Sequence, residues 1–91
     1  MLQNIFLEEY TMKNLDKFNK VICDTLNIKD IVNIKDEMGP DEIKSWDSLA
    51  HVELVSGLEE NFDINFDVVD ISRMYTIGDI KKILNKYGVE V

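Results

Sequence analysis

The chain has 91 residues, which allow one modest hydrophobic core and leave no room for a second domain. Apolar residues make up 45% of it, above the range in which disorder is expected, so we expect the chain to fold by itself. The formal net charge of −8 argues against a nucleic-acid binder, because contacts to phosphates need clustered lysine and arginine.

The lack of a recognisable targeting signal and the single cysteine predict a cytoplasmic protein. The N-terminus lacks the basic region and small-residue cleavage site of a secretory signal, and no apolar run approaches the roughly 18 residues of a membrane span. Cys23 is the single cysteine, which rules out an intrachain disulfide and favours a small buried side chain over a reactive thiol. We expect a monomer that binds neither nucleic acid nor membrane.

The negative charge is concentrated in one segment. Between Trp46 and Asp70 the chain has no lysine or arginine and seven carboxylates: Asp47, Glu53, Glu59, Glu60, Asp63, Asp67 and Asp70. Such a local negative field usually serves the encounter with a positively charged partner.

The first predicted helix runs from about Met12 to about Leu26, because apolar residues recur there at spacings of three and four. Its core-facing residues are Leu15, Phe18, Ile22 and Leu26. We take residues 12–91 as the domain and residues 1–11 as an N-terminal extension, whose Leu2, Ile5 and Phe6 either pack onto the domain or fray.

A long loop follows over residues 27–45, with a turn at Gly39-Pro40 that a helix would not accommodate. A structureless loop of this length is unusual in a compact domain unless it is functional. Its isoleucines, which we expect to anchor it beneath the helices, are Ile28, Ile31, Ile34 and Ile43.

The second predicted helix spans Ser48 to about Asn61, with Asp47 or Ser48 as its N-cap. Its predicted core face comprises His51, Leu54, Val55, Leu58 and Phe62. The opposite face comprises Leu49, Val52, Glu53, Ser56 and Glu60, so two aliphatic side chains lie among acids on a face that should be in water. This combination indicates an interface.

Two further elements complete the expected fold. A short helical turn is predicted near Asp67–Ile71, and a last helix from Thr76 to about Tyr87, with Thr76 as its cap and Gly88 ending it. We therefore predict an all-α four-helix bundle: three principal helices, one short helix, and a long loop between the first two.

Asp47-Ser48-Leu49, followed by Val52-Glu53-Leu54-Val55 and Leu58-Glu59-Glu60-Asn61-Phe62, resembles the acyl carrier proteins, in which D-S-L marks the start of the second helix. The resemblance covers roughly residues 15–84 and includes the long loop. It implies that Ser48 is esterified by 4'-phosphopantetheine from coenzyme A, and that the thiol of this arm carries acyl groups as thioesters. A separate magnesium-dependent phosphopantetheinyl transferase would catalyse the attachment, so the chain would be no enzyme and would have no catalytic residues.

The chemistry of a helix N-terminus supports the same assignment for Ser48. Its hydroxyl should be exposed, and free backbone N–H groups with the positive end of the helix dipole suit a phosphodiester there. The alternative reading of Ser48, a plain helix cap, fits the residue type but not the surrounding match.

The resemblance also implies an interface for acyl-loading and acyl-processing enzymes with basic docking patches. Asp47, Glu53 and Glu60 would pair with lysine or arginine, Leu49 and Val52 would be apolar anchors, and Ser56 lies among them. Weaker candidates for this surface are Glu59, Asp67 and Asp70. A second implied feature is a shelter for the acyl chain between the helices, lined by Val55, Leu58, Ile71, Ile77 and Ile80, although these residues would equally suit a tight core.

Some positions depart from the fatty-acid carriers, which usually have an acid where Ala50 follows D-S-L and often methionine at the place of Ser56. Trp46 and His51 frame a W-D-S-L-x-H pattern that resembles stand-alone carriers of specialised biosynthetic clusters, or carriers loaded by adenylating ligases, at least as much as it resembles fatty-acid carriers. We expect Trp46 to pack the loop onto the core and His51 to be a hydrogen-bonded residue at the bundle end. The pathway therefore stays open between fatty-acid and specialised-metabolite biosynthesis. Alternatives are an aminoacyl or hydroxyacyl carrier and an unmodified helical interaction module.

We expect no metal site. Asp63, Asn65 and Asp67 match the opening of a calcium-binding loop, but Val68 and Met74 replace its glycine and its bidentate glutamate.

Overall fold

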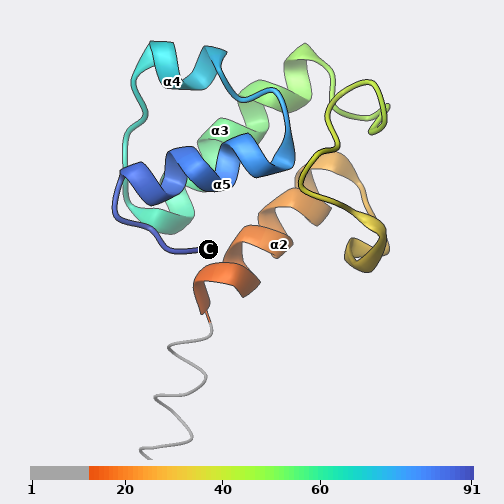
Figure 1. The fold of residues 1–91 in the computed structure, drawn as a ribbon, viewed down its shortest axis with the longest axis horizontal. Coiled ribbons are helices and arrows are strands. Elements are labelled where there is room, and N and C mark those ends of the chain that lie inside the picture. The colour runs from red at the N-terminus through yellow and green to blue at the C-terminus, as the bar shows by residue number, and fades with distance from the viewer. Residues whose placement is uncertain (1–12) are drawn as a thin grey trace, which may run out of the picture.

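The computed structural model describes residues 13–91 (Figure 1). This part of the chain contains four α-helices, one 3-10 helix and no strand: α2 (Lys13–Leu26), η1 (Ile31–Asn33), α3 (Ser48–Phe62), α4 (Val68–Ser72) and α5 (Ile77–Lys86). The predicted all-α fold, with three principal helices, one short helix and a long loop, is confirmed over these residues. The N-terminal extension and Met12, the expected first residue of the first helix, lie outside them.

One hydrophobic core joins the three principal helices, with α2 packed against α3. Its fully buried large side chains are Phe18, Ile22 and Leu26 from α2, Leu54 and Leu58 from α3, and Ile80 and Leu84 from α5. Burying a side chain of this size stabilises the fold by about 1.5–3 kcal/mol. The predicted core faces of these helices therefore supply most of the stabilising contact.

Two predictions on α2 need correction. Leu15 is 45% exposed instead of buried, because it lines an open pocket between α2, η1 and the start of α5 that the loop does not close over. Cys23 is only partly buried, and desolvation, followed by the charge of Asp24, raises the pKa of its thiol. A raised pKa means less thiolate, which agrees with an unreactive cysteine.

The loop between α2 and α3 is anchored at both ends and in its middle. Ile43 is buried, and Ile28, Ile31 and Ile34 pack partly against the core. The hydroxyl of Ser45 donates to the carbonyl of Leu26, 2.5 Å away, and so ties the loop to the end of α2. The anchored-loop prediction is therefore confirmed.

The same loop also caps α5. The backbone N–H groups of Ile77 and Gly78 donate to the carbonyls of Met38 and Asp36 at 2.9 and 2.7 Å, which satisfies amides that have no acceptor within the helix. Gly39 allows this close approach, because a Cβ atom there would collide with the backbone carbonyl of Tyr75. The loop and the start of α5 are thus one packed unit.

The helix boundaries follow the capping residues expected from the sequence. Thr76 accepts from the N–H of Asp79 at 3.0 Å, and Gly88 ends α5 with φ of 87°. At the C-terminal end of α3, Asp63 adopts the left-handed backbone conformation and ends the helix. Each helix is therefore within a residue or two of its predicted limits.

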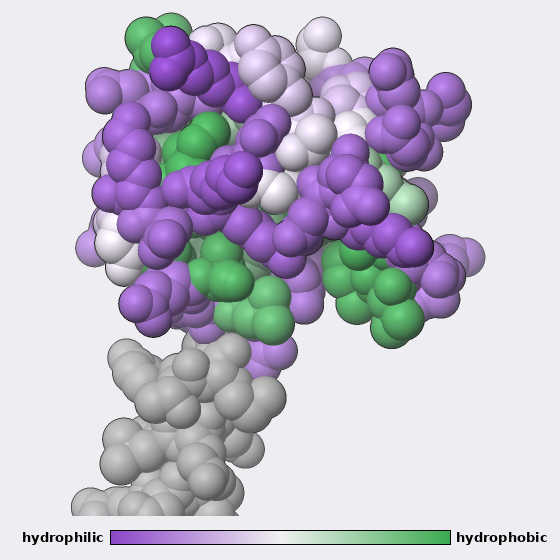
Figure 2. All heavy atoms as spheres, in the orientation of Figure 1, coloured by the Kyte–Doolittle hydropathy of each residue, from purple (hydrophilic) through white to green (hydrophobic). Residues whose placement is uncertain are grey.

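The surface in Figure 2 is mostly hydrophilic, with separate apolar patches. The large apolar side chains exposed among the described residues are Leu15, Val32, Leu49, Val52, Val68, Val69 and Tyr75. None of the helices in residues 13–91 combines the length and apolarity needed to cross a membrane.

Candidate modification and docking site

Ser48 is the first residue of α3, and its side chain is exposed. Asp47 precedes it as the N-cap: its Oδ1 accepts from the N–H of Ala50 at 2.8 Å, and its carbonyl accepts from the N–H of His51 at 2.9 Å. The amides of Ser48 and Leu49 precede this hydrogen-bond ladder and have no acceptor within the helix. Together with the positive end of the helix dipole, they make the surroundings of the Ser48 hydroxyl favourable for an anion.

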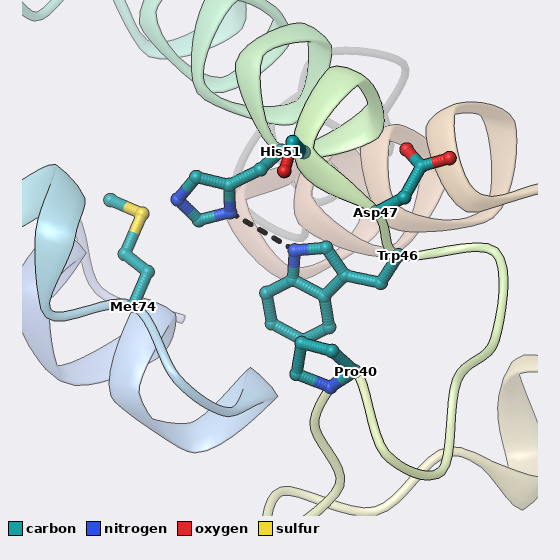
Figure 3. Close-up of a pocket in the computed structure, with 6 residues that line it drawn as sticks. Pro40, Trp46, Asp47, His51 and Met74 are labelled. Atoms are coloured by element: carbon teal, nitrogen blue, oxygen red, sulfur yellow. Dashed lines mark hydrogen bonds between the residues drawn. The ribbon is translucent and has the colours of Figure 1, made fainter.

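An open pocket of about 420 Å³ lies beside this serine. It is lined by Pro40 from the loop, Trp46, Asp47, Ser48 and His51 around the start of α3, and Met74 from the segment after α4. In Figure 3, His51 lies between Trp46 and Met74, and Pro40 lies against the indole ring. The pocket beside the serine therefore has apolar walls from Pro40, Trp46 and Met74 and polar ones from Asp47 and His51.

Trp46 and His51 form a hydrogen-bonded pair in this pocket (Figure 3). The indole Nε1–H donates to Nδ1 of His51 at 3.0 Å, and His51 Nε2 lies 3.1 Å from the carbonyl of Ile71 in α4. Because Nδ1 accepts, the geometry requires a neutral imidazole whose Nε2–H donates to that carbonyl. Trp46 is buried, so both the packing role predicted for the indole and the hydrogen-bonded histidine are confirmed.

The side chains predicted to meet partner enzymes are exposed on α3 and at its N-cap. Leu49 is 69% exposed and Val52 is 62% exposed, and the other four, Asp47, Glu53, Ser56 and Glu60, are also exposed. No lysine or arginine occurs in α3. The expected combination of exposed aliphatic and acidic side chains is thus present on one helix.

Sequence reasoning missed two further exposed aliphatic side chains, Val68 and Val69 on α4, which are 80% and 57% exposed. Helix α4 has five residues, which is too short for apolar periodicity to distinguish an inner from an outer face.

Of the three weaker acidic candidates, Asp67 is free to contact a partner, whereas the carboxylates of Glu59 and Asp70 accept hydrogen bonds within the domain. Asp67 is exposed. Glu59 is partly buried, and its carboxylate accepts from the N–H of Phe66 at 2.9 Å. Asp70 was wrongly placed among the surface acids: it is 5% exposed, accepts from Tyr87 Oη at 2.7 Å, and pairs with Lys86 Nζ at 2.9 Å.

The Asp70 contacts change both the local charge and the role of Lys86. Hydrogen bonds from Tyr87 and then Lys86 lower the pKa of the Asp70 carboxyl, and the bond to Asp70 raises the pKa of Lys86. Lys86 lies in the last turn of α5 and pairs with a carboxylate 16 residues earlier. The acidic surface is therefore smaller than the seven carboxylates of the segment suggest.

The residues expected to shelter an acyl chain belong to the core or touch it. Val55, Leu58, Ile77 and Ile80 are buried, and Ile71 packs partly against them. Of these, Val55 and Leu58 follow Ser48 and His51 at helical spacing along α3.

An all-α domain with an exposed serine at the N-terminus of an acidic central helix has the arrangement of a carrier domain. No family model matches the chain. Among curated proteins, an acyl carrier protein of Desulforapulum autotrophicum is 36% identical over 70 residues, which cover 77% of this chain and 91% of the relative. An acyl carrier protein of Bdellovibrio bacteriovorus is 33% identical over 70 residues, covering 67% of this chain and 90% of the relative.

The chain belongs to the acyl carrier protein family. Members of this family are carriers and not enzymes, so the general role of this protein is that of an acyl carrier.

Proposed function

We propose that this protein holds acyl groups as thioesters on a 4'-phosphopantetheine arm attached to Ser48, and presents them to partner enzymes of fatty-acid or specialised-metabolite biosynthesis. The observation that carries the proposal is the exposed Ser48 hydroxyl at the N-terminus of α3, in a chain of the acyl carrier protein family. When attached, the arm supplies the thiol that forms the thioester.

The residues around Ser48 fit such a group. The N–H groups of Ser48 and Leu49 have no acceptor within the helix and could donate to a phosphodiester, and the helix dipole favours its negative charge. The pocket of about 420 Å³ offers Pro40, Trp46 and Met74 as apolar walls for the arm. This chain therefore supplies an attachment point, an anion site and an adjacent surface.

The attachment itself uses Ser48 as nucleophile. Its oxygen forms a bond to the phosphorus that carries the pantetheine, the bond from that phosphorus to the bridging pyrophosphate oxygen breaks and releases adenosine 3',5'-bisphosphate, and the serine proton passes to a base of the transferase. The chain itself need not supply a base. Its single histidine, His51, has both ring nitrogens engaged in hydrogen bonds.

The outer face of α3 is the docking surface of the proposal. Asp47, Glu53 and Glu60 attract a basic patch, and Leu49 and Val52 provide apolar contact next to Ser48. Each exposed ion pair contributes only about 0–1 kcal/mol, so the charges mainly accelerate encounter. Association should therefore slow as salt is added.

The test is the intact mass of the purified protein before and after incubation with coenzyme A and a broad-specificity phosphopantetheinyl transferase. We expect a gain of one phosphopantetheine in the wild type and none in Ser48→Ala. Ser72→Ala is the matched control, since Ser72 is an exposed serine of α4 outside the proposed site, and it should be modified like the wild type.

Two results would contradict the proposal. If a known carrier is modified in the same reaction and the wild type is not, the unmodified helical interaction module becomes the better description. If Ser48→Ala still gains the mass, the attachment site is another residue. Once loading is established, the choice between fatty-acyl, hydroxyacyl and aminoacyl groups depends on which ligase or acyltransferase charges the thiol.

A further inference from the structure

His51 lies between Ser48 and the part of the core that could shelter an acyl chain. On a helix, residues three and four apart share a face, so His51 follows Ser48 by one turn, and Val55 and Leu58 continue the same stripe. A chain that starts at the Ser48 hydroxyl and runs inward along α3 therefore reaches the imidazole before it reaches Val55 or Leu58.

The imidazole is held in place from two sides. Trp46, from the end of the loop, donates to Nδ1 at 3.0 Å, and the carbonyl of Ile71 in α4 lies 3.1 Å from Nε2. Moving the ring aside would leave the indole N–H of Trp46, which is 3% exposed, without its partner. An unpaired buried donor is unfavourable. His51 thus connects the loop, α3 and α4 at the point where a chain would enter.

The spaces on the two sides of His51 differ. Farther along the same stripe of α3, Leu58 is fully buried and Val55 is 7% exposed, as in a packed core. Next to His51 lies the open pocket of about 420 Å³ beside Ser48, with Pro40 and Met74 in its wall.

We propose that His51 is a specificity-determining residue that keeps the carried acyl group in the open pocket and out of the helical core. The carrier then suits short acyl groups, hydroxyacyl and aminoacyl groups among them, instead of long alkyl chains that need an apolar interior. This inference rests on the proposed attachment at Ser48.

The test compares two loaded forms of the same protein. The transferase attaches acetyl- or octanoyl-phosphopantetheine from the corresponding coenzyme A thioester, and intact mass confirms loading. Methyl NMR spectra then report on Val55, Leu58 and Ile80. We expect their signals to be the same in the acetyl and octanoyl forms of the wild type. Octanoyl-dependent shifts of these core methyl groups would overturn the inference.

Two variants test whether His51 is the cause. His51→Ala should show octanoyl-dependent shifts of the core methyl groups. The control Asn61→Ala, which shortens an exposed side chain farther along α3, should behave like the wild type. Trp46→Phe removes the hydrogen-bond donor but keeps an aromatic ring, and should show part of the His51→Ala effect. Unchanged core signals in folded His51→Ala would refute the role of the histidine.

The comparison also separates this inference from the function on which it rests. Absence of added mass on Ser48 would overturn both. A loaded wild type whose octanoyl chain moves the core methyl groups would overturn the role of His51 alone. If His51→Ala did not fold, the wild-type spectra would still decide whether the chain enters the core, and Trp46→Phe would test the role of the histidine.

Discussion

Asp47 has two roles in the structure, and substitutions can separate them. Its carboxylate accepts from the N–H of Ala50 at 2.8 Å and so caps α3, and its charge belongs to the proposed docking surface. Asp47→Ala removes both, whereas Asp47→Asn keeps a side-chain oxygen and removes the charge. Because asparagine and aspartate are similarly good N-caps, only the alanine variant should lose the cap.

Loss of the cap should cost about 1 kcal/mol, within a range of about 0.5–2 kcal/mol. For a domain of this size, a change of about 1 kcal/mol lowers Tm by about 4–8 °C. Asp47→Asn should lose less, because only the favourable interaction with the helix dipole is removed. Thermal unfolding followed by circular dichroism measures both. Equal destabilisation by the two variants would refute the assignment of Asp47 as a hydrogen-bonding cap.

The charge is tested by kinetics. Asp47→Asn should lower kcat/KM of the phosphopantetheinyl transferase for this carrier at low salt, and the difference from wild type should shrink as salt screens the interaction. Glu90→Gln provides a control, since Glu90 is an exposed acid near the C-terminus and outside α3. If Asp47→Asn and wild type have the same kcat/KM at every salt concentration, Asp47 is not part of the docking surface.

Two further predictions concern stability. Ile43→Ala should lower the free energy of unfolding by about 2–5 kcal/mol in urea denaturation, because Ile43 anchors the loop in the core. Val32→Ala on the same loop should change the free energy of unfolding by less than about 0.5 kcal/mol. Equal effects of the two substitutions would contradict the anchoring role of Ile43. Asp70→Asn should be less stable than wild type at neutral pH, and the gap should narrow as the pH falls below about 4. The pKa of Asp70 is lower in the folded than in the unfolded state, so its stabilisation is present above the ordinary value and is lost as the pH falls through the folded value. A gap that stays constant with pH would refute this linkage.

The candidate site was largely predictable because it depends on local sequence. Asp47, Ser48 and Leu49 occupy consecutive positions at a helix start, and the faces of α3 follow from a fixed rotation per residue. The exposure of Leu49 and Val52 was predicted in this way, as was the cap at Thr76. Such features need no knowledge of how distant segments meet.

Tertiary structure decided the features that depend on distant partners. Asp70 meets Lys86 and Tyr87 across 16 and 17 residues, so a residue that composition places among the surface acids is buried and paired. The same holds for the contact of His51 with the carbonyl of Ile71, 20 residues away. Periodicity predicts which face of a helix a side chain lies on, but not which distant residue contacts that side chain.

The sequence by itself therefore determined the helices, their caps and the position of the exposed serine, since these are set by residues within one or two turns of each other. Only the tertiary structure decided that Leu15 is left uncovered, that the loop carbonyls of Asp36 and Met38 cap α5, and that His51 is hydrogen-bonded between Trp46 and the carbonyl of Ile71. Each of these depends on the path of the long loop and on the placement of α4, which hydrophobic patterns within a helix do not specify.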